Sequence, residues 1–390
     1  MERNVFASSG AYYTFDIPAL KRRIAYLRKN LPENVDLCYA VKANTFIAGD
    51  IADEIDRFEI CSPGESLICD RSGISADKTV ISGVYKSPEH IESLVKAGGG
   101  RIYTAESPRQ FDLLLALSQK YDSTIPVLLR ITNDSQFGME QADIEKIISE
   151  RKSHKNIDIL GIQFFSGTQK TSLKKLNREL KMLDEFIARL YEEYRFTVRE
   201  LEYGTGFPVS YFTEDEFDED EFLRGFSELL ANLNTDAKIT LELGRSIAAS
   251  CGCYYTDIVD IKHNKGQNYV LIDGGMHQLV YFGQHMAMKH PFMHVVGKEN
   301  AQPTALWNIC GSLCSMNDIV SKQVPLPDIA VGDKLCFKNT GAYCPTEGIS
   351  LFLSRDLPAV YKIYENGETR LIRPNIETAQ FNMLYNERSF

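Results

Sequence analysis

The first 250 residues alternate between short apolar, β-branched runs and longer segments with the periodicity of an amphipathic helix. The runs start about 20 to 40 residues apart, as in a series of β-then-α units. We predict eight strands, at residues 37–41, 58–61, 79–82, 101–104, 126–131, 157–165, 198–203 and 238–243. The helices predicted between them include residues 88–97, 107–121, 141–151, 172–194 and 219–233. Eight such units predict a closed (β/α)8 TIM barrel over residues 23–249.

An open, doubly wound sheet shows the same alternation, so the residues at the ends of the runs matter. In a barrel, the carboxyl ends of the strands meet at one rim, where active sites lie. Small, polar or charged residues follow many of the predicted strands here, which favours the barrel. These residues are Lys42, Ser62, Gly83, Arg130, Ser166, Gly167, Thr168, Gly204, Thr205, Gly206, Glu242 and Arg245.

Beyond about residue 250 the helical periodicity fades. Short strand-like runs are separated there by Gly, Asn, Asp and Pro, at residues 254–260, 269–272, 305–308, 334–337, 351–353 and 359–363. This pattern predicts a β-rich second domain of the sandwich or small-barrel type. Residues 6–15 also resemble a strand and can pair with it. We therefore expect a discontinuous β domain made of residues 1–22 and 250–390.

Charge and composition exclude several classes of function. The chain has 43 Lys and Arg against 53 Asp and Glu, a net charge of −10, which argues against a nucleic-acid partner. No apolar run approaches the ~18 residues of a membrane span. Nine cysteines without a CxxC pair suit a reducing cytoplasm, where we expect the protein to reside. The four histidines from His277 to His294 lack zinc-site spacing, so we expect no metal.

A set of residues at the predicted strand ends suggests a cofactor. Lys42 ends the first predicted strand, and partial desolvation at a barrel mouth favours the neutral amine that attacks carbonyls. A single lysine of this kind is more often a surface residue. However, residues 204–206 can bring backbone N–H groups close to a phosphate, Arg245 can pair with it, and Glu242 can keep a ring nitrogen protonated. Together these groups predict pyridoxal 5'-phosphate.

With these residues in order, the chain resembles the barrel-type (fold type III) pyridoxal-phosphate decarboxylases of the ornithine/diaminopimelate decarboxylase family. The resemblance runs from Tyr12 to about Tyr361. Its motifs are Tyr-Ala-Val-Lys-Ala-Asn (39–44), Ser-Gln-Phe-Gly-Met (135–139), Gly-Thr-Gly (204–206), Glu-Leu-Gly-Arg (242–245), Cys314 with Asp318, and Gly-Ala-Tyr (341–343). The cofactor-binding residues that it implies are Lys42, Arg130, Phe165, Thr168, Gly204, Thr205, Gly206, Glu242, Arg245 and Tyr343.

The family resemblance also implies a head-to-tail homodimer with shared active sites. One chain would supply Lys42 and Glu242, and the other would supply the catalytic Cys314 together with Asp318. Alone, Cys314 would be interpreted as a buried structural thiol. The implied reaction is loss of CO2 from an amino acid, with Cys314, or a group that it positions, protonating Cα.

Three departures from the family bear on the substrate. Phe165 stands where the family has a histidine stacked on the cofactor. Tyr281 replaces the arginine that grips the distal carboxylate in diaminopimelate decarboxylases, and Ser315 replaces the glutamate that binds the distal ammonium. We therefore name Tyr281, Ser315 and Asp318 as candidate substrate-binding residues. Losing both distal partners changes which polar substrate a buried site accepts.

These departures favour an L- or D-amino acid attached to a larger group, such as an aminoacyl unit on an acyl-carrier protein. Decarboxylation of free ornithine or lysine comes next, and decarboxylation of diaminopimelate in lysine biosynthesis is third. A racemase on the same fold, with Tyr343 as one base, is a rival. A pyridoxal-phosphate carrier without catalysis is another, although such proteins resemble the barrel alone. The Cys314 and Asp318 motif favours decarboxylation over both.

Overall fold

The computed structural model describes residues 10–384 and divides the chain into two compact units. One, the barrel unit, comprises Arg23–Pro208 and Asp218–Ile247. The other, the β unit, comprises the chain up to Arg22, Val209–Phe217 and the chain from Ala248 onward. The domain boundaries expected from the sequence, 23–249 for the barrel and 1–22 with 250–390 for the β domain, stay a prediction.

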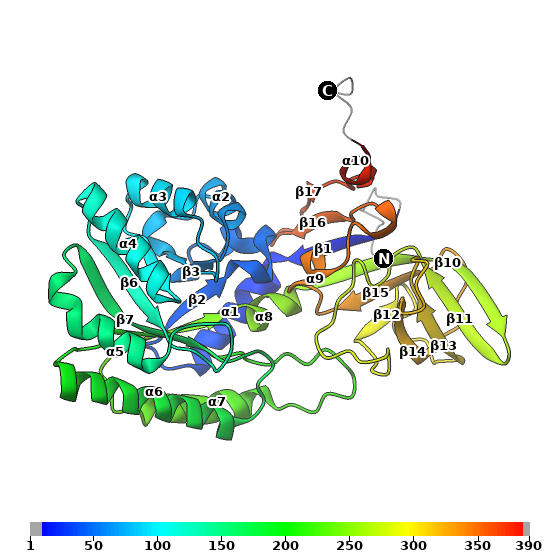
Figure 1. The fold of residues 1–390 in the computed structure, drawn as a ribbon. Coiled ribbons are helices and arrows are strands. Elements are labelled where there is room, and N and C mark those ends of the chain that lie inside the picture. Colours follow the sequence, from blue (N-terminus) through cyan, green and yellow to red (C-terminus); the bar gives the residue numbers. More distant parts are fainter. Residues whose placement is uncertain (1–9, 385–390) are drawn as a thin grey trace. The chain divides into compact units, whose positions relative to one another are not determined.

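Eight parallel strands close the barrel unit into a ring (Figure 1). The strands are β2 (Asp36–Ala40), β3 (Arg57–Ile60), β4 (Thr79–Ile81), β5 (Ile102–Ala105), β6 (Ile125–Arg130), β7 (Ile157–Phe165), β8 (Glu200–Gly204) and β9 (Lys238–Leu243). Each pairs with the next, and β2 pairs with β9, where Leu37 lies opposite Leu241. The predicted TIM barrel is confirmed.

Helices follow the strands on the outside of the ring (Figure 1). Serines start several of them, because a serine hydroxyl accepts a hydrogen bond from an otherwise unpaired N–H of the first turn. In three of these helices proline takes the first position, where its missing N–H costs nothing. The helices are α1 (Ile17–Asn30), α2 (Pro63–Arg71), α3 (Pro88–Ala97), α4 (Pro108–Tyr121), α5 (Gln141–Glu150), α6 (Leu173–Tyr194), α7 (Glu219–Ala231) and α8 (Arg245–Ala248).

The β unit is built on a mixed sheet. Its strands are β1 (Tyr12–Asp16), β10 (Gly252–Asn264), β11 (Gln267–Ile272), β12 (Met293–Val295), β13 (Ala305–Cys310), β14 (Ile319–Leu326), β15 (Lys334–Lys338), β16 (Ala359–Ile363) and β17 (Thr369–Arg373). The main path runs β14-β13-β11-β10-β1-β16-β17, and β15 pairs with both β10 and β12. Strand β1, from the start of the chain, lies between β10 and β16. Two short helices, α9 (Cys344–Glu347) and α10 (Ala379–Asn382), complete the unit.

The strand expected at residues 351–353 is wrong. Phe352–Ser354 forms a short 3-10 helix in which Leu353 has a φ of 59°. Leu351, Phe352 and Leu353 are each nearly half exposed, so they lack the cross-strand packing that stabilises a strand. Of the strand expected at residues 6–15, Tyr12–Asp16 is a strand, and residues 6–9 lie outside the described part of the chain.

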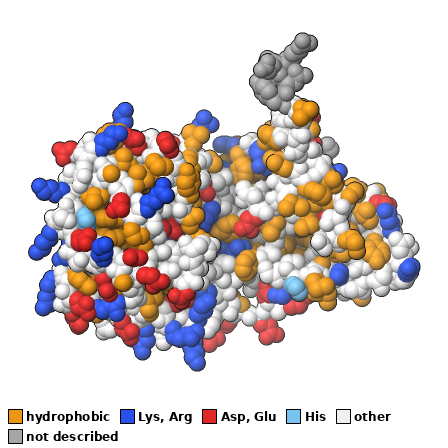
Figure 2. All heavy atoms as spheres, in the orientation of Figure 1, with side chains coloured by type: hydrophobic (Ala, Val, Ile, Leu, Met, Phe, Trp, Pro, Cys, Tyr) orange, Lys and Arg blue, Asp and Glu red, His pale blue; other side chains and the backbone are white. Residues whose placement is uncertain are grey.

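On the face drawn in Figure 2, acidic and basic side chains are interspersed over the barrel unit, without a large field of one sign. Within residues 10–384, no helix combines the length and the apolar character that a membrane crossing requires.

Candidate active site

Lys42 lies directly after the first barrel strand, in a single 3-10 turn made by Val41–Ala43. Val41 and Ala43 are fully buried, which turns the lysine between them away from the core. The motif also fixes its own turn, because the Asn44 side chain accepts a hydrogen bond from the Phe46 N–H at 2.9 Å. The Tyr39 hydroxyl donates to the Asn44 carbonyl at 3.0 Å. The Lys42 side chain remains 40% exposed.

Two buried carboxyl groups face the Lys42 ammonium. Its Nζ lies 2.7 Å from Glu59 Oε2 and 3.6 Å from Glu242 Oε1. Glu59 is on β3 and Glu242 on β9, the two strands that flank β2. Gln163 on β7 donates from Nε2 to Glu242 Oε2 at 3.2 Å. The structure therefore brings together Lys42 and Glu242, which the sequence named, and adds Glu59 as a second carboxyl group at the Lys42 ammonium.

The two carboxyl groups have opposite pKa shifts. Burial would raise the pKa of Glu59, but the Lys42 ammonium and hydrogen bonds to its carboxylate lower it overall. Burial, followed by repulsion from Glu59, raises the pKa of Glu242. Two carboxylates so close in a low dielectric cannot both ionise freely. Without a cofactor, Glu59 therefore loses its proton first, and Glu242 keeps its proton to a higher pH than an ordinary carboxyl group.

Two neighbouring loops contain four of the residues named for the phosphate: Thr168, Gly204, Thr205 and Gly206. The cradle loop, residues 166–170, follows β7, and the glycine loop, residues 204–206, follows β8. Arg245 joins the cradle loop through a hydrogen bond from its Nε to Thr168 Oγ1 at 3.3 Å. A Cβ on Gly206 would lie 2.0 Å from the Gly167 carbonyl oxygen, and Gly206 has a φ of +61°. Only glycine allows the two loops to approach this closely.

Phe165, named as the ring that stacks on the cofactor, ends β7 beside the glycine loop. A Cβ on Gly204 would lie 2.4 Å from the Phe165 ring. The missing side chain of Gly204 thus provides the space in which the phenyl ring lies. Thr205 between the two glycines is fully buried, and its Oγ1 accepts a hydrogen bond from the Phe207 N–H at 3.2 Å.

Arg130 ends β6, and its guanidinium is held on two sides. Its Nη1 lies 2.9 Å from Glu106 Oε1, and both side chains are almost completely buried. The Phe137 ring, from the motif at 135–139, lies under the guanidinium at 5.0 Å. Such a cation over an aromatic face is favourable when desolvated. The structure thus links Arg130 to the motif that follows it in sequence.

In the β unit, Cys314 and Ser315 lie on a loop between β13 and β14. Cys314 is exposed, which does not fit a buried structural thiol. Asp318 is only 3% exposed, and its two carboxylate oxygens accept hydrogen bonds from the Met276 and Leu313 N–H groups, each at 2.7 Å. Burial raises the pKa of Asp318 despite these bonds. Its carboxylate joins the loop at 311–313 to the loop at 274–276.

The two named tyrosines of the β unit have different surroundings. The Tyr281 hydroxyl donates to the Lys338 carbonyl at 2.6 Å, and its ring packs against Tyr211 and Phe212. Tyr343 precedes α9 and has a φ of +66°. This backbone region is sparsely populated for a bulky residue and often marks functional sites. Contacts of these residues with a substrate or cofactor stay predictions.

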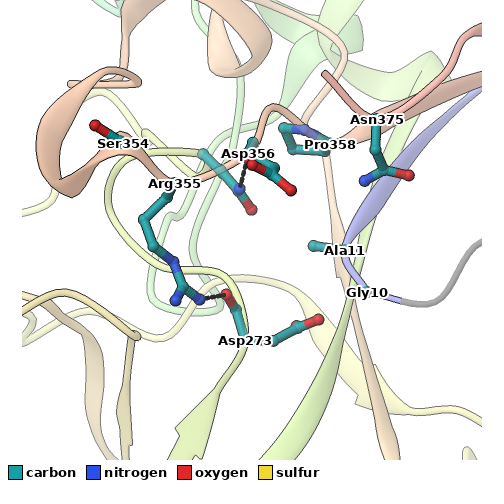
Figure 3. Close-up of a pocket in the computed structure, with 9 residues that line it drawn as sticks. Gly10, Ala11, Asp273, Ser354, Arg355, Asp356, Pro358 and Asn375 are labelled. Atoms are coloured by element: carbon teal, nitrogen blue, oxygen red, sulfur yellow. Dashed lines mark hydrogen bonds between the residues drawn. The ribbon is translucent and has the colours of Figure 1, made fainter. Parts of the chain in front are cut away.

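Two cavities lie within the β unit. One, of about 430 Å3, is lined by Tyr281 and by mostly apolar side chains: Met276, Leu279, Val280, Gln284, Met286, Ala287, Met316, Asn317, Ile319, Val320 and Lys322. The other, of about 330 Å3, is polar (Figure 3). In it Arg355 points toward Asp273 and donates to the Asp273 carbonyl at 3.1 Å, while Gln278 donates to the Asp356 carbonyl.

Sequence reasoning missed charged residues of the barrel unit. Glu59 interrupts an apolar run, and an acid inside a barrel strand was the available signal. Lys86 lies beyond β4, is 7% exposed, and donates to Gly83 O, Thr104 Oγ1 and Gln110 Oε1. Burial lowers its pKa to about 8. Lys170 and Glu179 form a third buried group, for which the sequence offered no clear signal. Within residues 10–384, no cluster of three or more His, Cys, Asp or Glu side chains suits a metal ion.

The donor set of the barrel unit fits pyridoxal phosphate. The cofactor needs an amine for its aldehyde, an acid for its ring nitrogen and small residues with a cation for its phosphate. Lys42, after β2, and Glu242, on the neighbouring strand β9, supply the amine and the acid, and the two loops meet at a point that a Cβ on Gly206 would fill. Arg245 is hydrogen-bonded to one of those loops.

Comparisons with known proteins agree with a pyridoxal-phosphate site. The family model described as "Pyridoxal-dependent decarboxylase, C-terminal sheet domain" matches residues 13–341. The L-glutamyl-[BtrI acyl-carrier protein] decarboxylase of Niallia circulans is 26% identical over 93% of this chain and 90% of its own length. The 2-[(L-alanin-3-ylcarbamoyl)methyl]-2-hydroxybutanedioate decarboxylase of Staphylococcus aureus is 27% identical over 85% of this chain and 88% of its own.

A solved structure shares the fold. The diaminopimelate decarboxylase from M. jannaschii, in complex with L-lysine, superposes with a TM-score of 0.85 at 20% identity, over 97% of this chain and 93% of that one. The resemblance that the motifs suggested is confirmed by the family match, which covers most of both units. The chain belongs to the family of pyridoxal-phosphate-dependent decarboxylases.

Proposed function

We propose that this enzyme removes the α-carboxylate of an amino acid that is attached to a larger group, such as a carrier protein. The observation that carries the proposal is the environment of Tyr281. Its hydroxyl is bound to the Lys338 carbonyl and its ring is packed among aromatic residues. This position therefore offers no cation for a distal carboxylate, and Ser315 offers no charge for a distal ammonium.

The cavity beside Tyr281 supports the same proposal. Its lining is mostly apolar, with Lys322 as the charged side chain and no acid among the residues that line it. A free diamino acid would lose hydration there without gaining a partner for its far ammonium group. A substrate whose side chain continues into an amide or thioester has no far ammonium group, so no unpaired charge would be desolvated. The similarity to a decarboxylase named for a carrier-bound glutamyl substrate points the same way.

In the proposed reaction the residues of the barrel unit hold the cofactor. Lys42 Nζ would supply the amine that holds the cofactor through its aldehyde. The Glu242 carboxylate would accept a hydrogen bond from the protonated ring nitrogen, and its negative charge would favour that protonated form. Phe165 would stack on the ring, and Arg245, Thr168 and the glycine loop would bind the phosphate, together with Arg130 and with Tyr343 contributed by the other chain of the dimer proposed below. The bound cofactor supplies a ring that accepts the electron pair left when CO2 departs.

The remaining residues complete the proton transfer. Cys314 Sγ–H, or a group that it positions, donates a proton to the substrate Cα after CO2 leaves. The exposure of Cys314 in the single chain fits a residue that acts in an assembly. We propose a cytoplasmic homodimer in which Cys314, Ser315 and Tyr343 of one chain complete the barrel site of the other. Asp318 supports this loop through its bonds to backbone N–H groups.

One experiment tests the activity and its substrate together. The purified holoenzyme is incubated with glutamyl carrier protein, free ornithine, lysine and meso-diaminopimelate in parallel, and released CO2 is measured. The variants Lys42→Ala and, as a matched control on the surface of α3, Lys96→Ala are assayed beside it. We expect CO2 from the carrier-bound substrate, unchanged turnover in the control, and loss of both turnover and cofactor absorbance in Lys42→Ala.

Other outcomes overturn specific parts of the proposal. Preference for meso-diaminopimelate would reject the interpretation of Tyr281 and Ser315. Formation of the opposite enantiomer without release of CO2 would show that the enzyme is a racemase and not a decarboxylase. Cofactor binding without turnover of any amino acid would indicate a protein that carries pyridoxal phosphate without catalysing a reaction. Full activity in Lys42→Ala would remove the basis of the mechanism.

A further inference from the structure

A buried ion pair lies next to the proposed phosphate site. Lys170, the last residue of the cradle loop, is 5% exposed, and its Nζ lies 2.7 Å from Glu179 Oε2 on α6. The Glu179 side chain is only 11% exposed. A buried pair of this kind stabilises the fold little more than apolar residues of the same size would. Stability alone therefore does not explain its presence.

The pair is part of a closed network of hydrogen bonds. Lys170 Nζ also donates to Ser166 Oγ at 2.9 Å, and the Ser166 hydroxyl donates to Glu179 Oε1 at 2.5 Å. The Tyr203 hydroxyl, from β8, donates to Glu179 Oε2 at 2.6 Å. Both ends of the cradle loop, Ser166 and Lys170, are thereby attached to the same carboxylate. Thr168, the partner of Arg245, lies between those two ends.

The network also joins the cradle loop to the glycine loop. The Lys170 N–H donates to the Gly206 carbonyl at 2.9 Å. A Cβ on Gly206 would lie 2.8 Å from Lys170 Cε as well as 2.0 Å from the Gly167 carbonyl. Lys170 therefore contacts the glycine loop with both its backbone and its side chain, and its stem lies against Gly206.

The ammonium of Lys170 is directed at Glu179 and Ser166, so it acts on the site through the loops. Burial would raise the pKa of Glu179, but the bonds from Lys170, Ser166 and Tyr203 lower it overall. The carboxylate is thus held ionised, as an acceptor of three donors. Charge-assisted bonds of this kind are shorter and stronger than neutral ones, and they fix geometry well.

We propose that Lys170 and Glu179 are positioning residues that hold the cradle loop and the glycine loop at the separation that the cofactor phosphate requires. This inference rests on the proposed function, because it assigns the phosphate to these loops. It predicts an effect on the phosphate end of the cofactor and none on its aldehyde end, where Lys42 reacts.

The test compares two probes on the cofactor-free protein: pyridoxal 5'-phosphate and pyridoxal, which lacks the phosphate. Their dissociation constants are measured by absorbance titration for the wild type and for Lys170→Met. We expect Lys170→Met to bind pyridoxal 5'-phosphate about tenfold to a hundredfold more weakly, as follows from losing bonds to a charged group. We expect its affinity for pyridoxal to stay within about twofold of the wild type.

Two further variants separate positioning from stability. Arg57→Met breaks another buried ion pair of the barrel unit, with Glu200, at the opposite ends of the strands. It should lower the melting temperature yet leave the ratio of the two dissociation constants unchanged. The double variant Lys170→Met/Glu179→Met removes the unpaired charge, so we expect its melting temperature to recover while pyridoxal 5'-phosphate binding stays weak.

The outcomes distinguish this inference from the proposed function. If Lys170→Met bound both probes equally weakly, the pair would have only a structural role. The same would follow if the affinity of the double variant for pyridoxal 5'-phosphate recovered together with its melting temperature. Wild-type affinity in Lys170→Met would reject the inference and leave the enzyme's assignment intact. Failure of the wild type to bind pyridoxal 5'-phosphate would instead reject the assignment itself.

Discussion

The central group of side chains in the barrel is Lys42 with Glu59 and Glu242. The sequence predicted the lysine and Glu242, because each stands at the end of an apolar run in a recognisable motif. It did not predict Glu59, since the direction of a side chain inside a strand depends on how the barrel closes. The pairing of Ala40 with Glu59 and of Cys38 with Glu242 places both acids on the strands next to Lys42.

The raised pKa of Glu242 has a consequence for stability. Burial and Glu59 raise it from 4.5 to about 8 in the cofactor-free chain. A carboxyl with a higher pKa in the folded state stabilises the fold below its unfolded pKa and loses that contribution as the pH rises through the folded value. The neutral variant Glu242→Gln lacks this loss.

We therefore expect the cofactor-free wild type to lose stability relative to Glu242→Gln as the pH rises from about 5 to about 8. The relative loss should be at least about 1 kcal/mol in the free energy of unfolding. Urea unfolding across this range measures it, with the exposed Glu33→Gln as the control. Parallel pH profiles for the wild type and Glu242→Gln would contradict the assignment of a protonated Glu242.

At the scale of elements, strands and helices of the barrel were predictable where their periodicity was strong. Strands β7 and β9 and helix α3 match the expected bounds. In the β unit, β12, β14 and β17 were missed. Strand β14 contains Pro325 and a residue with positive φ, Gln323, while β17 is a largely exposed edge strand. Such strands show little alternation of apolar and polar side chains, because pairing with neighbouring strands rather than local strand propensity stabilises them.

The two loops of the phosphate site give a prediction at this scale. Gly206→Ala combines a left-handed backbone with a Cβ placed 2.0 Å from the Gly167 carbonyl. Gly73→Ala is the matched control, because Gly73 has a φ of +77° and open space around its Cβ position. We expect a loss in the free energy of unfolding of about 1 kcal/mol in the control and clearly more in Gly206→Ala. Urea unfolding checks this, and equal losses would mean that the loops are not in close contact.

At the scale of the whole molecule, the named site residues divide between the two units. Lys42 and Glu242 belong to the barrel unit, and Cys314 and Tyr343 belong to the β unit. The sequence motifs identified both groups, but periodicity and motifs carry no information on which copy of the chain supplies each one. The proposed homodimer answers this by pairing the β unit of one chain with the barrel of another.

Mixing two inactive variants tests the shared site. Lys42→Ala and Cys314→Ala are each expected to be inactive, but a heterodimer would contain one site with both native residues. After dissociation and random reassociation we expect about a quarter of the wild-type activity, since half of the dimers are mixed and each has one intact site. Activity is measured as CO2 release. A mixture that stays inactive, although the subunits exchange, would place all groups of a site on one chain.

The position of β1 bears on how the chain is made. Strand β1 precedes the barrel in the sequence, yet it lies antiparallel to β10 and parallel to β16, which follow the barrel. The barrel lies between these strands in the sequence, so β1 cannot pair fully with β16 until the chain has been synthesised through Ile363. Such distant pairing slows folding and leaves a strand edge open to association with other chains. Expression yield should consequently be more sensitive to changes in β1 or β16 than to changes on the outer helices of the barrel.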